Sequence, residues 1–423
     1  MALFLAVVPA LAVIVGFSQL MSRLALAVGQ PRVVGEMVAG LLLGPSLFGL
    51  IAPELHQALF SPDVKAVLYV LGNIGLTTYM FLVGAEIDRD WLVGGQIQRA
   101  VILAVSGIVP SFLLGVAVGY WLHGALALEH ISALKFAFFM GCASSITAFP
   151  MLARILQERG LSNSLIGSLT LVAASIDDAV AWSFLAIITA MFQARTLFAG
   201  LATILGGIMF TAMMLVVVRP MVRPLGDATE RSGTLSQPGL AFVLLILLGA
   251  AWFTDYIGIF SVFGGFITGL CMPRTQILRR ELRDRLLDFN VVLLIPVFFT
   301  YSGLNTRFNG LTGIALLVPF LIVLLAAVVG KYGGCGLTMR MMGFSWRQSS
   351  AIGGLMNARG LMELMLINLG LAYGMITQDV FSILMLMTII TTAMAMPIYR
   401  LSLPREHETE LRQVIETSKV SQA

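Results

Sequence analysis

Long apolar runs divided by short polar segments fill almost the whole chain of 423 residues. An α-helix rises ~1.5 Å per residue and the hydrocarbon core of a bilayer is ~30 Å thick, so about 20 apolar residues can cross it. The runs predict an all-α membrane protein with about thirteen transmembrane helices. Their expected ranges are 2–27, 33–51, 63–86, 99–122, 134–157, 162–191, 197–219, 237–254, 257–272, 289–304, 311–339, 348–374 and 378–399.

The composition excludes a soluble protein. Hydrophobic residues make up 58% of the chain and charged residues 11%, whereas soluble domains carry about 25% charged residues. The three cysteines, Cys142, Cys271 and Cys335, fall in apolar runs at unrelated spacings. We therefore expect buried thiols there, and neither a disulfide framework nor a metal site.

The basic residues predict the orientation of the chain. With the N-terminus outside, the inner loops and tail collect twenty Lys and Arg residues and the outer loops only four. Because Lys and Arg accumulate on the cytoplasmic side, this asymmetry favours an outer N-terminus, a cytoplasmic C-terminus and an odd number of spans. The net charge of +4 is thus a topology signal and not a sign of nucleic-acid binding.

Two spans carry helix-breaking residues at membrane depth. The fifth contains Cys142–Pro150 and the twelfth contains Gly353–Gly360. If the seventh span is a linker, the spans form two inverted six-helix repeats, and the two patches occupy matching positions. We expect broken helices around 144–150 and 354–360, whose free backbone ends can bind or steer ions. One such patch alone would fit close helix packing or a kink equally well.

Asp177 and Asp178 lie in the middle of the sixth apolar run. A carboxylate at that depth costs ~2.5 kcal/mol or more, and adjacent helix positions point ~100° apart. A division of roles follows: one carboxylate pairs with a basic group, and the other is left to a proton or a cation. Hard cations prefer oxygen ligands, which the hydroxyls of Ser144, Ser145 and Thr147 could supply. The structural alternative is a salt bridge between helices.

Lys331 lies inside the eleventh run, among Gly330, Gly333, Gly334 and Gly336. Small residues let another helix come close, so the pattern favours a buried ammonium that pairs with a carboxylate. The alternative is a lysine that reaches the membrane surface as an interface anchor.

The remaining charges inside the spans have a more structural character. Arg359 and Glu363 are spaced i, i+4, where opposite charges can meet on one helix face. We expect this pair, next to Asn357, to brace the broken helix. Glu36 lies near the inner end of the second span, at a cavity mouth or paired with a loop arginine.

At these residues the chain resembles the cation:proton antiporter superfamily, which includes bacterial Na+/H+ and K+/H+ antiporters and plant cation/H+ exchangers. The likeness covers most of the chain. The motifs that carry it are Val34–Ser46, the broken fifth span, Asp177-Asp178, Pro296–Leu304, Gly330-Lys331 and Met356–Leu364.

The resemblance implies a core bundle, here about 99–191 and 311–399, packed against a dimerisation part formed by the other spans. It implies that Asp178 binds the monovalent cation, with Thr147 beside it, and that Asp177 pairs with Lys331. An Asp-Asp pair goes with the electrogenic branch. The resemblance also implies a homodimer, in a bacterial inner membrane.

We expect one transmembrane unit over 1–400 and a short cytoplasmic tail over 401–423. The tail is too small for a nucleotide-binding domain and has no GxGxxG fingerprint. No cofactor is expected beyond the transported Na+ or K+ and H+.

The predicted function is secondary active antiport, not enzyme catalysis. In this hypothesis proton and cation compete for Asp178 during alternating access. A monovalent cation channel and an ion sensor on the same fold remain the alternatives. An intramembrane aspartyl hydrolase is disfavoured, because its two aspartates come from separate helices and no GxGD stretch is present.

Overall fold

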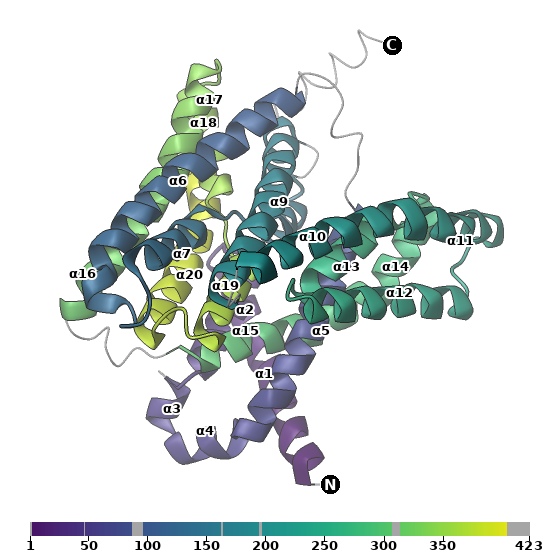
Figure 1. Cartoon of the computed structure of the whole chain (residues 1–423), viewed down its shortest axis with the longest axis horizontal. Helices are drawn as coiled ribbons and strands as arrows, with labels where there is room; N and C mark the ends of the chain where they lie inside the picture. The colour runs from purple at the N-terminus through teal and green to yellow at the C-terminus, as the bar shows by residue number, and fades with distance from the viewer. Residues whose placement is uncertain are drawn as a thin grey trace. The chain divides into compact units, whose positions relative to one another are not determined.

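The computed structural model describes residues 2–45, 47–86, 96–161, 164–193, 197–306 and 314–403. Every regular element in these ranges is a helix (Figure 1). Eleven of the helices are long and apolar enough to cross a membrane, which confirms the all-α membrane class. Most of the predicted tail, from 404 onward, lies outside the described residues.

The chain divides into two compact units. The first comprises 1–23, 35–88 and 182–307, and the second comprises 24–34, 89–181 and 308–423. The first unit contains most of α1 (Ala2–Ala27) and α2 (Arg32–Leu43), α3 (Phe48–Ile51), α4 (Pro53–Leu59), α5 (Pro62–Glu86), the end of α9 (Leu165–Gln193), α10 (Leu197–Met213), α11 (Arg219–Ser232), α12 (Gln237–Tyr256), α13 (Ser261–Cys271), α14 (Gln276–Phe289) and α15 (Ile295–Leu304).

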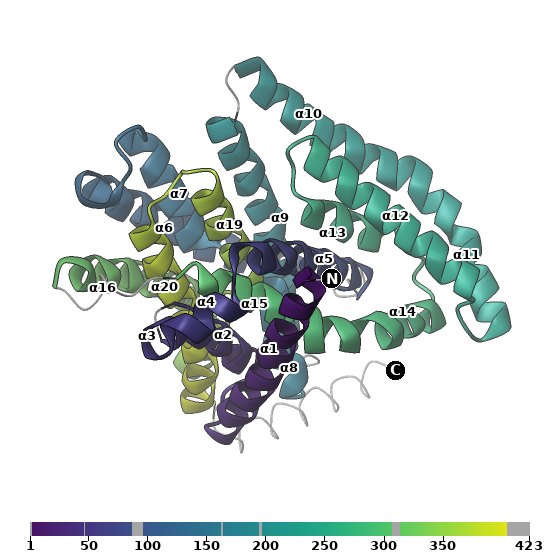
Figure 2. The same cartoon turned by 90° about the horizontal axis from the view of Figure 1, so that it is seen from below.

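Two pairs of helices in the first unit are continuous. A π-helical turn at Met214–Val218 joins α10 to α11, and another at Asn290–Leu294 joins α14 to α15. Figure 2 shows α10 and α11 as one long helix. The predicted span at 289–304 therefore starts earlier, at Gln276, and includes the charged segment before it.

The charged segment is helical because it is amphipathic. Leu278 and Leu282 are buried, and salt bridges join Arg280 to Asp284 and Arg285 to Glu281 at i, i+4 spacing. Such pairs stabilise a helix that has little apolar surface of its own.

Close backbone contact explains part of the second-span motif in the first unit. A Cβ placed on Gly40 would collide with the backbone of Phe299, and one on Gly303 would collide with Gly40. Glycine at both positions lets α2 and α15 touch directly.

The second unit contains the end of α1, the start of α2, α6 (Gln96–Leu126), α7 (Ala133–Ser145), α8 (Phe149–Glu158), α9 up to Ala181, α16 (Ile314–Val328), α17 (Gly334–Met341), α18 (Trp346–Met356), α19 (Leu361–Ala372) and α20 (Gln378–Ser402). A π-helical turn at Val329–Gly333 joins α16 to α17. Helix α6 packs against α7, α16 and α17, and α18 packs against α20.

Candidate functional site

Two broken helices meet inside the second unit. Helix α7 ends at Ser145 and α8 begins at Phe149, and α18 ends at Met356 and α19 begins at Leu361. The linking residues bond across the gap: the Ala148 N–H donates to the Ala358 carbonyl at 3.1 Å, and the Thr147 hydroxyl donates to the Met356 carbonyl at 2.8 Å. Both breaks lie where the sequence predicts them, and each supplies hydrogen-bond partners for the other.

Two buried basic side chains, those of Lys331 and Arg359, lie at the C-terminal end of α7. Lys331 Nζ donates to the Ser145 carbonyl at 2.6 Å. The Arg359 guanidinium donates to the carbonyls of Ala143, at 2.8 Å, and Ser144, at 2.5 Å. The last carbonyls of a helix have no partner within the helix and carry partial negative charge, so positive groups stabilise this end.

Asp177 and Asp178 have different partners. Asp177 Oδ2 lies 2.6 Å from Lys331 Nζ, with both side chains fully buried. Asp178 Oδ1 accepts the backbone N–H of Phe149 at 3.3 Å, where the start of α8 favours negative charge. Asp178 Oδ2 is buried and has no hydrogen-bond partner among the described residues. Asp177 Oδ1 also has no hydrogen-bond partner among the described residues. The two carboxylates therefore differ in what their other oxygen binds: Asp177 pairs with a basic side chain, and Asp178 with a backbone N–H.

Arg359 is positioned by more than Glu363. The predicted salt bridge is present, but Arg359 Nη1 and Glu363 Oε2 are 3.5 Å apart, a longer contact than the bonds to the α7 carbonyls. The backbone of Arg359 is fixed by Thr392 on α20, whose hydroxyl accepts the Arg359 N–H at 2.9 Å and donates to the Arg359 carbonyl at 2.8 Å. Nothing in the sequence distinguishes Thr392 from the many other threonines in apolar runs.

The predicted hydroxyl ligands lie near the breaks. Two of them, Ser145 and Thr147, donate hydrogen bonds to backbone carbonyls. The Ser145 hydroxyl donates to the Cys142 carbonyl at 3.0 Å, and Thr147 donates to Met356 as described above. An oxygen that donates a proton keeps lone pairs that can still coordinate a cation. Asn357 is fully buried, and neither polar atom of its side chain has a hydrogen-bond partner among the described residues.

Glu36 is not part of this group in the second unit. It lies on the section of α2 that belongs to the first unit and is 2% exposed. The other predicted residues, from Ser144 to Glu363, all belong to the second unit.

The π-helical turn sets the position of Lys331. Such turns add a residue to the helix and occur frequently at functional sites. A Cβ on Gly330 would lie 2.6 Å from Ser111 Cα, and one on Gly334 would collide with the Ser106 carbonyl. The predicted close packing is therefore correct for these two glycines. It is wrong for Gly333, where an added Cβ would lie in open space with nothing within 4 Å.

Gly330→Ala is expected to lower the thermal stability of the purified protein, by roughly 1–3 kcal/mol, because the added methyl group overpacks the contact with α6. Gly333→Ala is the matched control, with the same change of residue in the same turn but open space around it. Thermal unfolding in detergent measures both. Equal stability of the two variants would contradict the argument that Gly330 is needed for close contact.

Sequence comparison links this chain to known proteins. The family model described as sodium/hydrogen exchanger, transmembrane, matches residues 10–399. The chain is 38% identical over 387 residues to the Na(+)/H(+) antiporter NhaS4 of Synechocystis sp., covering 91% of this chain and 94% of that protein.

Relatives in eukaryotes are longer. The chain is 35% identical to Cation/H(+) antiporter 17 of Arabidopsis thaliana, over 87% of this chain, and 28% identical to K(+)/H(+) antiporter 1 of Saccharomyces cerevisiae, over 92% of it. It spans 45% of the length of each of these two relatives.

The fold also matches a solved structure, that of the sodium proton antiporter MjNhaP1 from Methanocaldococcus jannaschii. The TM-score is 0.65 with 13% identity, over 94% of this chain and 99% of the other. At this identity the likeness concerns the fold alone. The family model and the cyanobacterial relative both cover nearly the full length, and they show that this chain belongs to the transmembrane sodium/hydrogen exchanger family.

Proposed function

We propose that this chain exchanges a monovalent cation, Na+ or K+, for protons across the membrane by alternating access, with proton and cation competing for Asp178. The observation that carries this proposal is the buried Asp178 carboxylate, held by the first N–H of α8 through one oxygen while the other has no partner among the described residues. The printed names of the relatives, which are Na(+)/H(+), cation/H(+) and K(+)/H(+) antiporters, support it.

Charge balance explains why exchange would be coupled. An unoccupied, ionised Asp178 is costly to carry through a region of low dielectric constant, whereas a site neutralised by a proton or a cation crosses more easily. The Asp177–Lys331 salt bridge lies next to Asp178 in the sequence and provides a second group that can release a proton. When cation binding breaks the Asp177–Lys331 salt bridge, Lys331 releases a second proton and Asp177 stays ionised, so two protons exchange for one monovalent cation and net charge crosses the membrane.

The finer architecture is part of the same proposal. The eleven long spans, the short apolar helix α13 and the broken pair α18–α19 give thirteen crossings. Twelve of these crossings form two inverted six-helix repeats and the seventh links them, with the N-terminus outside and the C-terminus in the cytoplasm of a bacterial cell. The second unit is the transporting core, and the first unit mediates a homodimer.

The proposal is tested in proteoliposomes loaded with a pH-sensitive dye. Addition of Na+, Li+, K+ or Rb+ is expected to dissipate an imposed pH gradient, faster when a membrane potential favours net charge movement. Cation flux without proton movement would identify a channel. Cation binding with no flux at all would identify a sensor, and either result would overturn antiport.

Lys331→Ala is expected to slow exchange and to remove its dependence on membrane potential, because only Asp178 would then release a proton. The variant should also be less stable by about 3–5 kcal/mol, since Asp177 is left buried without its partner. Removing both charges in the Asp177→Asn, Lys331→Ala double variant should restore most of this stability.

Arg347→Ala is the control for Lys331→Ala, because Arg347 is an exposed basic residue in the first turn of α18 in the same unit. Flux is measured against pH with and without an imposed potential. An unchanged pH profile and voltage dependence in Lys331→Ala would mean that Lys331 has a structural role only.

A further inference from the structure

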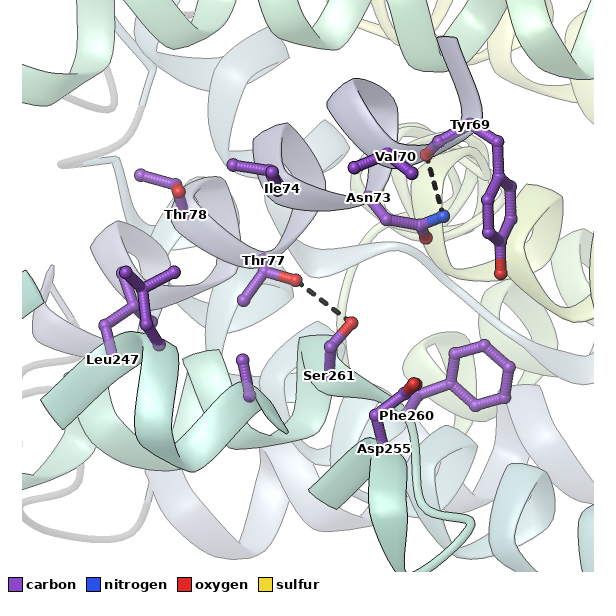
Figure 3. Close-up of a pocket in the computed structure, with 12 residues that line it drawn as sticks. Tyr69, Val70, Asn73, Ile74, Thr77, Thr78, Leu247, Asp255, Phe260 and Ser261 are labelled. Atoms are coloured by element: carbon purple, nitrogen blue, oxygen red, sulfur yellow. Dashed lines mark hydrogen bonds between the residues drawn. The ribbon is translucent and has the colours of Figure 1, made fainter. Parts of the chain in front are cut away.

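A cavity in the first unit lies outside the proposed exchange site. It has a volume of about 200 Å³ and opens between α5, α12 and the start of α13. Figure 3 shows Tyr69, Asn73 and Asp255 toward one end of the cavity and Thr78 and Leu247 toward the other. All of its lining residues belong to the first unit, so the cavity is a feature of that unit alone.

The charge of the described cavity lining is negative. Among the described residues that line it, Asp255 is the one charged side chain, and there is no Lys, Arg or His. Asp255 lies in the last turn of α12, and its side chain is exposed. A carboxylate without a basic neighbour in the lining attracts a cationic group and repels an anionic one.

The walls between the two ends are mostly apolar. Val70 and Leu248 are 54% and 56% exposed and line the cavity from facing helices. Both α5 and α12 are long and apolar enough to cross a membrane, so their exposed apolar residues offer a surface that an acyl chain can contact. Leu247 and Asp255 are eight residues apart on α12, which is about 12 Å along the helix. That length suits the first part of an acyl chain below a polar head group.

We propose that this cavity binds an aminophospholipid, with the ammonium of the ethanolamine head group at Asp255 and the start of an acyl chain along Val70 and Leu248. The aromatic rings of Tyr69 and Phe260 line the same region and favour a cation on their faces. The Thr77 hydroxyl donates to Ser261 Oγ at 3.3 Å, which leaves the Ser261 O–H as a neutral donor to the phosphate.

Hydrogen bonding and charge distinguish the ethanolamine lipid from the choline and glycerol lipids. A choline head group has no N–H to donate to Asp255, and an anionic glycerol head group finds no basic partner in the lining. The inference is independent of antiport, because its readout is lipid retention and requires no transport.

Native mass spectrometry of the full-length protein tests the inference. The protein is exchanged into detergent with equal amounts of phosphatidylethanolamine, phosphatidylcholine and phosphatidylglycerol. We expect it to retain the ethanolamine lipid about tenfold more than the choline lipid, the value of one charge-assisted hydrogen bond. Asp255→Asn should reduce this ratio to near one. Asp63→Asn, which removes a carboxylate in the first turn of α5 outside the lining, should leave it unchanged.

A second variant tests whether the lipid binds in the cavity or elsewhere on the protein surface. Val70→Trp fills the cavity from an exposed position and should reduce retention of the ethanolamine lipid while thermal stability stays near that of the parent protein. Equal retention of the three lipids, a preference for phosphatidylglycerol, or an ethanolamine preference that survives both Asp255→Asn and Val70→Trp would overturn the proposal. Dimers that retain no lipid would also overturn it, since a second copy would then cover the cavity.

Discussion

Asp178→Asn is expected to abolish cation-dependent proton flux in proteoliposomes while the protein stays folded. The Asn side-chain oxygen can still accept the Phe149 N–H that Asp178 accepts at 3.3 Å, so the start of α8 keeps its cap. The amide has no titrating proton and no charge for a cation. A buried ion without its counter-charge is disfavoured by about 3 kcal/mol or more, so exchange should fall by about 100-fold or more at matched cation concentration.

The two neighbouring variants make the assignment of Asp178 specific. Asp177→Asn should retain measurable exchange with altered voltage dependence, because it removes the partner of Lys331 and leaves Asp178 in place. Asp379→Asn, in the first turn of α20 in the same unit, should exchange like the parent protein. If Asp178→Asn keeps flux within about twofold of the parent protein, the exchange site lies elsewhere.

The sequence predicts the charged residues of the site well, because the cost of a charge in an apolar span is a local property. Asp177, Asp178 and Lys331 are conspicuous within their own runs, and the need to neutralise buried charge predicts that one of the two carboxylates pairs with a basic group. The family resemblance assigns that role to Asp177, and its salt bridge with Lys331 is present. The breaks are predictable for a similar reason. Pro150 lacks a backbone N–H, and the glycines of Gly353–Gly360 stabilise a helix poorly.

Partners that are far apart in sequence and bind through the backbone could not be predicted. Arg359 binds carbonyls of Ala143 and Ser144, more than 200 residues away, and every residue type has a carbonyl. The local spacing suggested Glu363 as the partner, which is the longer contact in the structure. Thr392 is hidden for the same reason, because its bonds are to the backbone of Arg359.

Arg359→Ala is expected to destabilise the protein by about 3–5 kcal/mol and to abolish exchange. The substitution removes the donors to two carbonyls at the end of α7 and the basic partner of Glu363, all of them buried. A buried charge or acceptor that loses its partner carries the full desolvation penalty. The end of α7 would then lose its alignment with α8, where Asp178 binds.

Conservative variants test whether the Arg359–Glu363 pair braces the broken helix or titrates during exchange. A lysine has one ammonium and cannot reproduce the planar fork that reaches two carbonyls, so Arg359→Lys should be intermediate in stability. Glu363→Gln should change stability less than Arg359→Ala and leave the pH profile of exchange unaltered, because the guanidinium is held mainly by α7. Thermal unfolding and flux against pH measure all three. A shifted pH profile in Glu363→Gln would make Glu363 a proton carrier. An Arg359→Ala variant as stable as the parent protein would refute the bracing role of Arg359.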